Sequence, residues 1–289
     1  MTIFDLRVKE TVNGYLAELE KHFSSDIVSF YGPIGPPVDK IFRDFIEKLK
    51  QDFPGQERVT IFLTTPGGLV ETVETLVDII RFHYKEVYFV VPDYAMSAGT
   101  IFCLSGNKIF MDYSSSLGPV DPQIFTGRGY VSALGYLDQV DRMIEKSKKG
   151  DLSDAELVML QDLDLAMLNS YEQQKNLTIT LLKEWLVNYK FADWKTHGTT
   201  KTKLGQPVTN EEKRERAEQI ATKLSDNKEW HSHGRRIGIG KLRDVLHLQI
   251  EDYSNDVPVR TKIREYHDFL VDYIQRNKYE AFLHSKNYF

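Results

Sequence analysis

The sequence has one cysteine, no long apolar run and no concentration of basic residues. Cys103 is the single cysteine among 289 residues, which excludes an internal disulfide and makes a small buried side chain its expected role. No apolar stretch reaches the roughly 18 residues of a membrane-spanning helix, so no integral membrane segment is expected. Lys and Arg are scattered and the formal net charge is -5, so no nucleic-acid-binding face is expected. The N-terminus lacks the basic and apolar regions of a signal peptide, and we expect a cytoplasmic protein.

The apolar residues follow the periods of alternating strands and helices. An amphipathic helix is predicted over residues 1–24. Strands are predicted next at residues 26–32, 59–64, 87–91 and 108–112, with helices at residues 38–49 and 70–84 and a short one that ends near Gly106. This alternation predicts an α/β fold with right-handed crossovers and a mostly parallel sheet over about residues 25–125.

Helical signals dominate the rest of the chain. Ser153 and Thr209 are each followed by a glutamate in capping-box spacing, so each predicts the start of a helix. The first of these helices is expected to run without a break over residues 153–174. The polar stretch 193–207 predicts a mobile loop, and residues 260–285 show helical spacing.

Two short motifs lie where predicted strands end and helices begin. In TTPGG, Gly67 and Gly68 follow a strand and permit close approach of a ligand to the backbone. In YAMSAGT, Ser97 stands at the start of a helix, where its hydroxyl can serve as a nucleophile. The N–H groups of Gly68 and Ala98 would then form an oxyanion hole. Taken singly, the glycines also suit a tight turn and Ser97 also suits a helix N-cap, so residue types alone leave these alternatives open.

The order of four motifs resembles a known family. They are TTPGG, YAMSAGT, SSSLGPVDPQ and ATKLSDNKEWHSHGRRIG. Together they resemble the serine dehydrogenase proteinase family of the Clp/crotonase superfamily, which also contains ClpP and signal peptide peptidase A. The resemblance covers about residues 25–125 and 210–245. It implies a Clp/crotonase-like superhelix of β-β-α units, to which this chain adds helical N- and C-terminal extensions. It also implies serine endopeptidase activity that needs no ATP.

The same resemblance assigns roles to the residues of the first two motifs. It implies that Ser97 is the nucleophile, that Gly68 and Ala98 donate to the oxyanion, and that Gly67 leaves room for the substrate. It also implies a homo-oligomer. The aromatic-rich terminal helices could supply its interface, although burial within the monomer would explain them equally well. The general base is not assigned in this way, because the chain reads GPVD where ClpP-like proteins carry their catalytic histidine.

Two kinds of general base stay open. His233 in the last motif can take the proton of Ser97, although a structural role for this histidine is an alternative. A desolvated lysine is the second kind, as in signal peptide peptidases. Lys146, Lys148 and Lys149 lie in a charged run that is expected to be solvated, whereas Lys175, in the middle of the following helix, is a less exposed candidate. Asp121 either orients the base or belongs to a turn before Pro122.

Neither a metal nor a cofactor is expected. His231, His233 and His197 lack the spacing of a metal site, and no carboxylate-histidine helical motif accompanies them. The predicted divisions are an N-terminal helix at residues 1–24, a serine protease domain at 25–250 with a helical insertion at about 150–208, and a C-terminal helical extension at 251–289.

Three functions are compatible with these motifs. The first is a peptidase that acts on extended peptides or unfolded proteins. The second is a crotonase-type enzyme, in which the same two amides would hold an acyl-CoA enolate, but the sequence marks neither an adenine pocket nor a carboxylate base. The third is a catalytically silent scaffold or binding protein, which the absent histidine near Asp121 favours and the intact Ser97 opposes.

Overall fold

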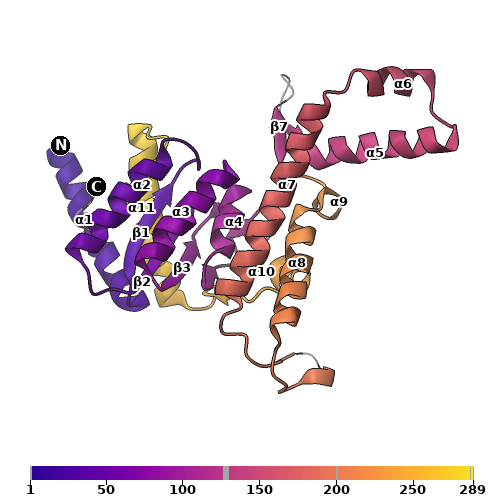
Figure 1. Ribbon diagram of the computed structural model, residues 1–289. Coiled ribbons are helices and arrows are strands. Elements are labelled where there is room, and N and C mark those ends of the chain that lie inside the picture. The colour runs from indigo at the N-terminus through magenta and orange to yellow at the C-terminus, as the bar shows by residue number, and fades with distance from the viewer. Residues whose placement is uncertain (1, 126–129, 200, 287, 289) are drawn as a thin grey trace.

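The computed structural model describes residues 2–125, 130–199, 201–286 and 288, and a six-stranded sheet forms the centre of this part of the chain (Figure 1). The strand order is β10-β1-β2-β3-β5-β9. The strands are β1 (Asp26–Tyr31), β2 (Arg58–Thr64), β3 (Glu86–Val91), β5 (Lys108–Met111), β9 (Glu251–Asp252) and β10 (Phe282–His284). Neighbouring strands are parallel except β10, which is antiparallel to β1. The expected α/β class with a mostly parallel sheet is therefore confirmed.

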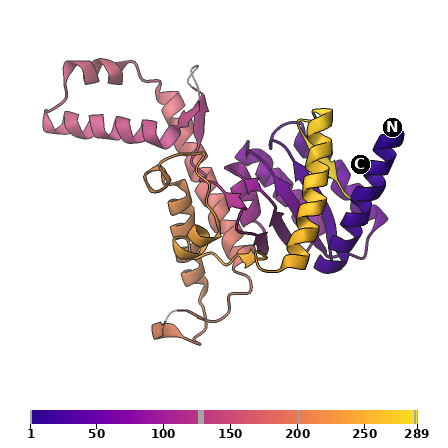
Figure 2. The ribbon, with the colours of Figure 1, turned by 180° about the vertical axis from the view of Figure 1, so that it is seen from behind.

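Helices cover both faces of this sheet (Figures 1 and 2). The helices on one face are α1 (Ile3–Phe23) and α11 (Val257–Asn277), and those on the other are α2 (Val38–Asp52), α3 (Val70–His83) and α4 (Ala98–Leu104). Phe62 of β2 packs in the core between the sheet and helices α1 and α11. Its neighbour Ile61 packs in the core between the sheet and helices α2, α3 and α4. Since successive strand residues point to opposite faces, the central strands read as continuous apolar runs.

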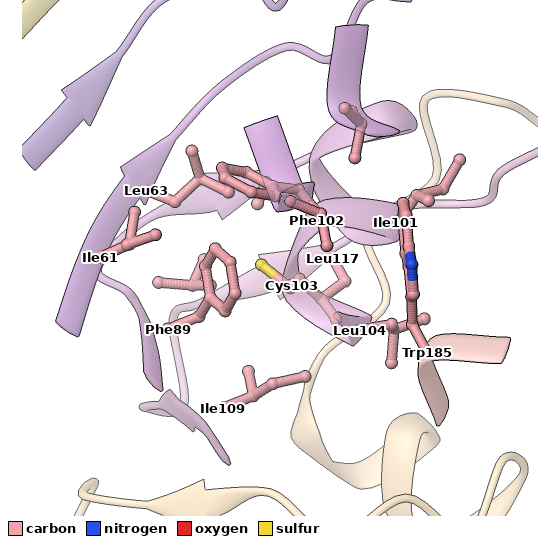
Figure 3. Packing of buried hydrophobic residues seen from close by; sticks show 14 of the residues in the cluster. Ile61, Leu63, Phe89, Ile101, Phe102, Cys103, Leu104, Ile109, Leu117 and Trp185 are labelled. Carbon is pink, nitrogen blue, oxygen red and sulfur yellow. The ribbon is translucent and has the colours of Figure 1, made fainter. Parts of the chain in front are cut away.

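The core on the side of α2, α3 and α4 contains the single cysteine (Figure 3). Cys103 of α4 is fully buried in the cluster that also holds Leu63, Phe89 and Ile109. Burial raises the pKa of its thiol, because the charged thiolate would lose its hydration. The expectation that Cys103 is a small buried residue is thus confirmed.

A helical arm projects from the body of the molecule (Figure 1). Its elements are α5 (Ala133–Lys149), α6 (Asp154–Gln161) and the N-terminal part of α7 (Leu165–Trp185). The expectation of one unbroken helix over residues 153–174 is wrong. Asp164 starts a new helix by accepting hydrogen bonds from the N–H groups of Ala166 and Met167, and a polar N-cap of this kind separates α6 from α7. Helix α5 was not expected from the sequence pattern.

The chain then returns to the body through helix α8 and several shorter elements. They are the π-helix η1 (Leu186–Lys190), the 3₁₀ helix η2 (Lys201–Lys203), α8 (Asn210–Ser225), α9 (Asn227–Trp230) and α10 (Ile239–Asp244). The expected capping box is present, with Thr209 and Glu212 bonded reciprocally at the start of α8. The loop between η1 and α8 is closed by a bridge between Thr196 and Pro207, and its mobility stays a prediction.

The C-terminal segment completes the sheet. The expected helix over residues 260–285 is wrong in its last part, because Lys278 adopts a left-handed conformation and ends α11. The chain then enters β10, in which Leu283 pairs with Phe30 of β1. The terminal segments thus pack on or within the central sheet, while the three-part division of the chain stays a prediction.

Two short strand pairs accompany the sheet in the described residues. They are β4 (Tyr94–Ala95) with β6 (Ser116–Leu117), and β7 (Gln123–Phe125) with β8 (Tyr130–Ser132). No helix in the described ranges is both long and apolar enough to cross a membrane. The cytoplasmic location stays a prediction.

Candidate active site

Ser97 lies on a tight turn between β4 and α4. Its backbone has φ 51 and ψ -118, a conformation that an L-residue adopts at a cost of about 1–3 kcal/mol. Its carbonyl oxygen accepts hydrogen bonds from the N–H groups of Thr100 and Ile101, at 2.8 and 3.2 Å. Every residue of α4 is buried, while Ser97 itself is partly exposed. The fixed helix thus presents the serine on a strained turn, as enzymes do with an accessible nucleophile.

The two glycines lie against this turn. A Cβ atom on Gly67 would lie 2.8 Å from the Cβ of Ser97 and 2.8 Å from the carbonyl oxygen of Met96. A Cβ atom on Gly68 would lie 1.8 Å from the carbonyl oxygen of Ile34. Both glycines have positive φ, 107 and 152, so they meet two demands, an unusual backbone conformation and a close approach between three segments of chain.

Two backbone N–H groups beside Ser97 are suited to bind an oxyanion. Within the described residues, neither the Gly68 N–H nor the Ala98 N–H donates a hydrogen bond to another group of the chain. The Ala98 nitrogen lies 3.3 Å from the position of a Cβ on Gly67, which shows how closely the two motifs approach. Ile34 bonds to the carbonyl of Gly67 and to the N–H of Leu69, both at 2.8 Å. Since N–H groups alternate in direction along an extended chain, the N–H of Gly68 points away from Ile34.

A histidine and an aspartate of two later segments form a hydrogen-bonded pair. The Nδ1 atom of His233 lies 2.8 Å from the Oδ1 atom of Asp121. The Asp121 side chain is 2% exposed and the His233 side chain 27%, so the carboxylate is buried beneath an accessible imidazole. Because a carboxylate only accepts hydrogen bonds, the pair places the proton on Nδ1 and leaves Nε2 as an acceptor. This is the arrangement of base and orienting carboxylate in hydrolase triads.

Gln123 holds the second oxygen of this carboxylate. Its Nε2 atom donates a hydrogen bond of 2.9 Å to the Oδ2 atom of Asp121. The sequence motifs did not identify Gln123, although it belongs to the GPVDPQ stretch. Both oxygens of Asp121 therefore have a side-chain partner, which fixes the plane of the carboxylate.

The topology brings Ser97 and the histidine–aspartate pair to one end of three adjacent segments. Ala95 pairs in parallel with Leu117, and Leu117 pairs antiparallel with Ile237. Ser97 follows Ala95, Asp121 follows Leu117, and His233 precedes Ile237, so all three lie beyond the same end of these pairs. No hydrogen bond joins Ser97 to His233 in the described residues, and catalytic hydrogen bonds of this kind commonly shorten only when substrate is bound.

The lysines have surroundings that argue against a role as base. Lys146 pairs with Glu156 at 2.6 Å, and Lys148 pairs with Glu145 at 2.7 Å. The Glu145 carboxylate raises the pKa of Lys148, which keeps this lysine charged. Lys149 is exposed at the end of α5, and Lys175 is half-buried on α7, where no hydrogen bond or ion pair joins it to Ser97 or His233 among the described residues.

The other two histidines do not join this site. His231 is exposed and, in a left-handed conformation, caps α9. His197 is buried in the loop before α8, where its Nε2 atom lies 3.2 Å from the Oε1 atom of Glu212. Its ring contacts Trp194 edge to face. The three histidines of the sequence analysis thus occupy different surroundings.

Gly67→Ala is expected to damage this site directly. The added methyl group would collide with the Met96 carbonyl and with Ser97, and the residue would keep an unfavourable φ of 107. The free energy of unfolding should fall by about 1–3 kcal/mol, and labelling by a serine-reactive fluorophosphonate should be lost. Urea denaturation and intact mass measure the two effects. Gly35→Ala is the matched control, because a Cβ on Gly35 meets nothing within 4 Å, and equal effects of both substitutions would contradict this prediction.

The sequence matches the model of one protein family and the sequences of two other proteins. The model of a family described as ClpP-like SDH-type serine proteinase matches residues 44–229. The chain is 31% identical over 179 residues to uncharacterized protein MJ0137 of Methanocaldococcus jannaschii, covering 58% of this chain and 58% of that protein. It is 26% identical over 192 residues to uncharacterized protein MJ1495 of the same organism, covering 66% of this chain and 52% of that protein. The chain thus spans little more than half the length of these relatives.

Solved structures show more distant similarity. The 1510-N membrane-bound stomatin-specific protease, as a mutant, is 14% identical with a TM-score of 0.45, over 81% of this chain and 82% of that chain. ClpP1 from Listeria monocytogenes is 15% identical with a TM-score of 0.42, over 80% of this chain and 93% of that chain. The family model, in contrast, spans well over half of the sequence and includes Ser97 and Asp121, although it ends before His233. The chain therefore belongs to the ClpP-like SDH-type serine proteinases.

Proposed function

We propose that this protein is a serine endopeptidase that cleaves extended or unfolded polypeptide without ATP, through an acyl-enzyme on Ser97. Membership of a serine proteinase family supports this proposal. The observation that carries it is the hydrogen bond between His233 and the buried Asp121, because this pair supplies the general base that the motifs left open. A fold of this kind without a base would suit a scaffold equally well.

The proposed reaction begins with proton transfer from the Oγ atom of Ser97 to the Nε2 atom of His233. Ser97 attacks the scissile carbonyl, and the N–H groups of Gly68 and Ala98 stabilise the oxyanion. His233 then gives the proton to the leaving amine, and Asp121 stabilises the imidazolium meanwhile. Water enters, loses its proton to His233, and releases the acyl group from Ser97.

The backbone near Ser97 supports an extended substrate. Ile34 occupies one side of the segment from Gly67 to Leu69, and the Gly68 N–H points to the other side. A peptide in extended conformation can pair with this free side as an additional strand. Such pairing reads the backbone of the substrate, so folded proteins would be cleaved poorly and unfolded ones well.

We also propose that the protein forms a homo-oligomer. Apolar side chains are exposed on the helical arm, and none of the residues of α6 is buried. The exposed side chains are Leu157, Val158, Met159 and Leu165, with exposed fractions of 46% to 75%. An apolar patch on a projecting element supports association with other copies of the chain. The helical arm is therefore at least as good a candidate for the interface as the terminal helices.

The test of the proposed function is cleavage of an unfolded, fluorescently labelled protein in the absence of ATP. Appearance of peptides with new N-termini, identified by mass spectrometry, is the expected result. Folded substrate of the same sequence should be cleaved far more slowly. Stabilisation by acyl-CoA without peptide cleavage would favour the crotonase-type alternative, and neither response in a folded protein would favour a scaffold.

Gln123→Leu is expected to lower kcat about tenfold with little change in KM. The substitution keeps the side-chain size and removes one hydrogen bond to a carboxylate, which contributes on the order of 1.5 kcal/mol or more. Steady-state kinetics on a fluorogenic peptide measure both constants. The control is Gln173→Leu, at an exposed position on α7. A loss that appears in KM alone, or in both variants equally, would argue against a positioning role for Gln123.

A further inference from the structure

An apolar cavity lies at the edge of the sheet. Its volume is about 410 Å³, and its walls come from β1, β10, α2 and the C-terminal segment. Phe30, Phe45, Phe282 and Tyr288 are among the lining residues. Cavities of about 300–1,000 Å³ with mostly apolar walls are the usual sites of small ligands.

Apolar surface is left exposed at this cavity. Ile41 of α2 lines it and is 54% exposed, although the remainder of its helix face is packed into the core. A partner that covers Ile41 and fills the cavity would remove this apolar area from water, which favours binding. The site therefore favours a ligand with an apolar body.

One positive charge borders the same cavity. Lys9 of α1 is the single charged residue among the described residues that line it. Each carboxylate of α1 already has another partner. Asp5 bonds with Thr2 and Tyr273, Glu10 with Arg7, Glu18 with Lys262, and Glu20 with Lys286. Among the described residues, no hydrogen bond or ion pair joins Lys9 to another group, so its ammonium group is available to a ligand.

The neighbourhood of Lys9 reaches into the buried end of β10. Burial and, to a smaller extent, the positive charge of Lys9 together lower the pKa of His284 to about 3. His284 therefore stays neutral, with Tyr266 at its Nδ1 atom and Asn13 at its Nε2 atom. No second positive charge on this histidine competes with Lys9 for an anion near neutral pH.

We infer that the cavity binds a medium- or long-chain fatty carboxylate, with its apolar chain between β10 and α2 and its carboxylate at Lys9. Charge complementarity selects the head group, because Lys9 is the single cation among the described residues that line this mostly apolar cavity. A neutral chain would leave this cation unpaired, and a compact anion would leave the apolar walls unfilled. The site shares no residue with Ser97, Asp121 or His233, so the inference stands independently of the proposed peptidase activity.

Isothermal titration of the full chain with decanoate, and with decanol as the uncharged match, tests the inference below the micellar range. Decanoate should bind at least tenfold more tightly than decanol. A series from octanoate to dodecanoate should gain about fourfold in affinity per methylene group until the cavity is filled. Equal affinity for decanoate and decanol, or no dependence on chain length, would overturn the inference.

Two variants locate the site. Lys9→Gln should abolish the preference for decanoate over decanol, while Lys21→Gln, at an exposed position on the same helix, should leave it unchanged. Ile41→Glu places a negative charge at the cavity and should weaken decanoate at least tenfold, with circular dichroism as the check of folding. Unchanged binding in both Lys9→Gln and Ile41→Glu would overturn the inference. Binding of a peptide with a C-terminal leucine but not of decanoate would overturn it as well.

Discussion

Ser97→Ala is expected to abolish peptide cleavage, with a loss in kcat of about 10⁴-fold or more. The substitution removes the attacking oxygen and keeps the Cβ atom that Gly67 accommodates, so the surrounding structure should persist. Steady-state hydrolysis of an unfolded substrate measures the loss. A residual rate within tenfold of the native protein would show that another residue is the nucleophile.

The strained turn offers a second readout on the same residue. Ser97 has a positive φ of 51, which glycine adopts without cost. Ser97→Gly should therefore be inactive yet more stable than Ser97→Ala, by about 1 kcal/mol in urea denaturation. A site that holds its nucleophile in an unfavourable conformation gives up stability for function, and this pair of variants separates the two properties.

Asp121→Asn is expected to lower kcat by about 10³- to 10⁴-fold with little change in KM. An amide in place of the carboxylate can donate to Nδ1 of His233, which would move the proton to Nε2 and disable the base. The measurement is steady-state kinetics on the same peptide, together with the double variant Asp121→Asn/His233→Gln. Because the two residues act as one unit, the double variant should be no slower than His233→Gln alone.

A second buried aspartate provides the control. Asp112 is fully buried and bonds with Ser114, Ser115 and Arg264, remote from the proposed chemistry. Asp112→Asn should lower the free energy of unfolding and leave kcat unchanged. Equal losses of kcat in both aspartate variants would show that Asp121 has only a structural role.

The sequence predicted the central sheet because its strands are buried on both faces and therefore read as continuous apolar runs. It failed where short polar signals override the apolar period. Asp164 interrupts an apolar helical pattern by capping a new helix, and Lys278 ends α11 before a three-residue strand. Strand β10 depends on its pairing with β1, which is a contact between opposite ends of the chain. Local patterns do not contain such pairing.

The candidate site divides in the same way. Ser97, Gly67 and Gly68 could be identified from the sequence, since each follows a strand and the backbone chemistry there is local. The pairing of Asp121 with His233 joins residues 112 positions apart and depends on the bridge between Leu117 and Ile237. Only the tertiary structure shows this pairing. Gln123 escaped notice because a glutamine has no catalytic signature of its own.

Intact-mass labelling with a fluorophosphonate is the measurement that tests the central claim most directly, namely that His233 and Asp121 activate Ser97. The native protein should gain one adduct, Ser97→Ala should gain none, and His233→Gln should react at least about 100-fold more slowly. No adduct on the folded native protein, or an unchanged labelling rate in His233→Gln, would contradict the proposed mechanism.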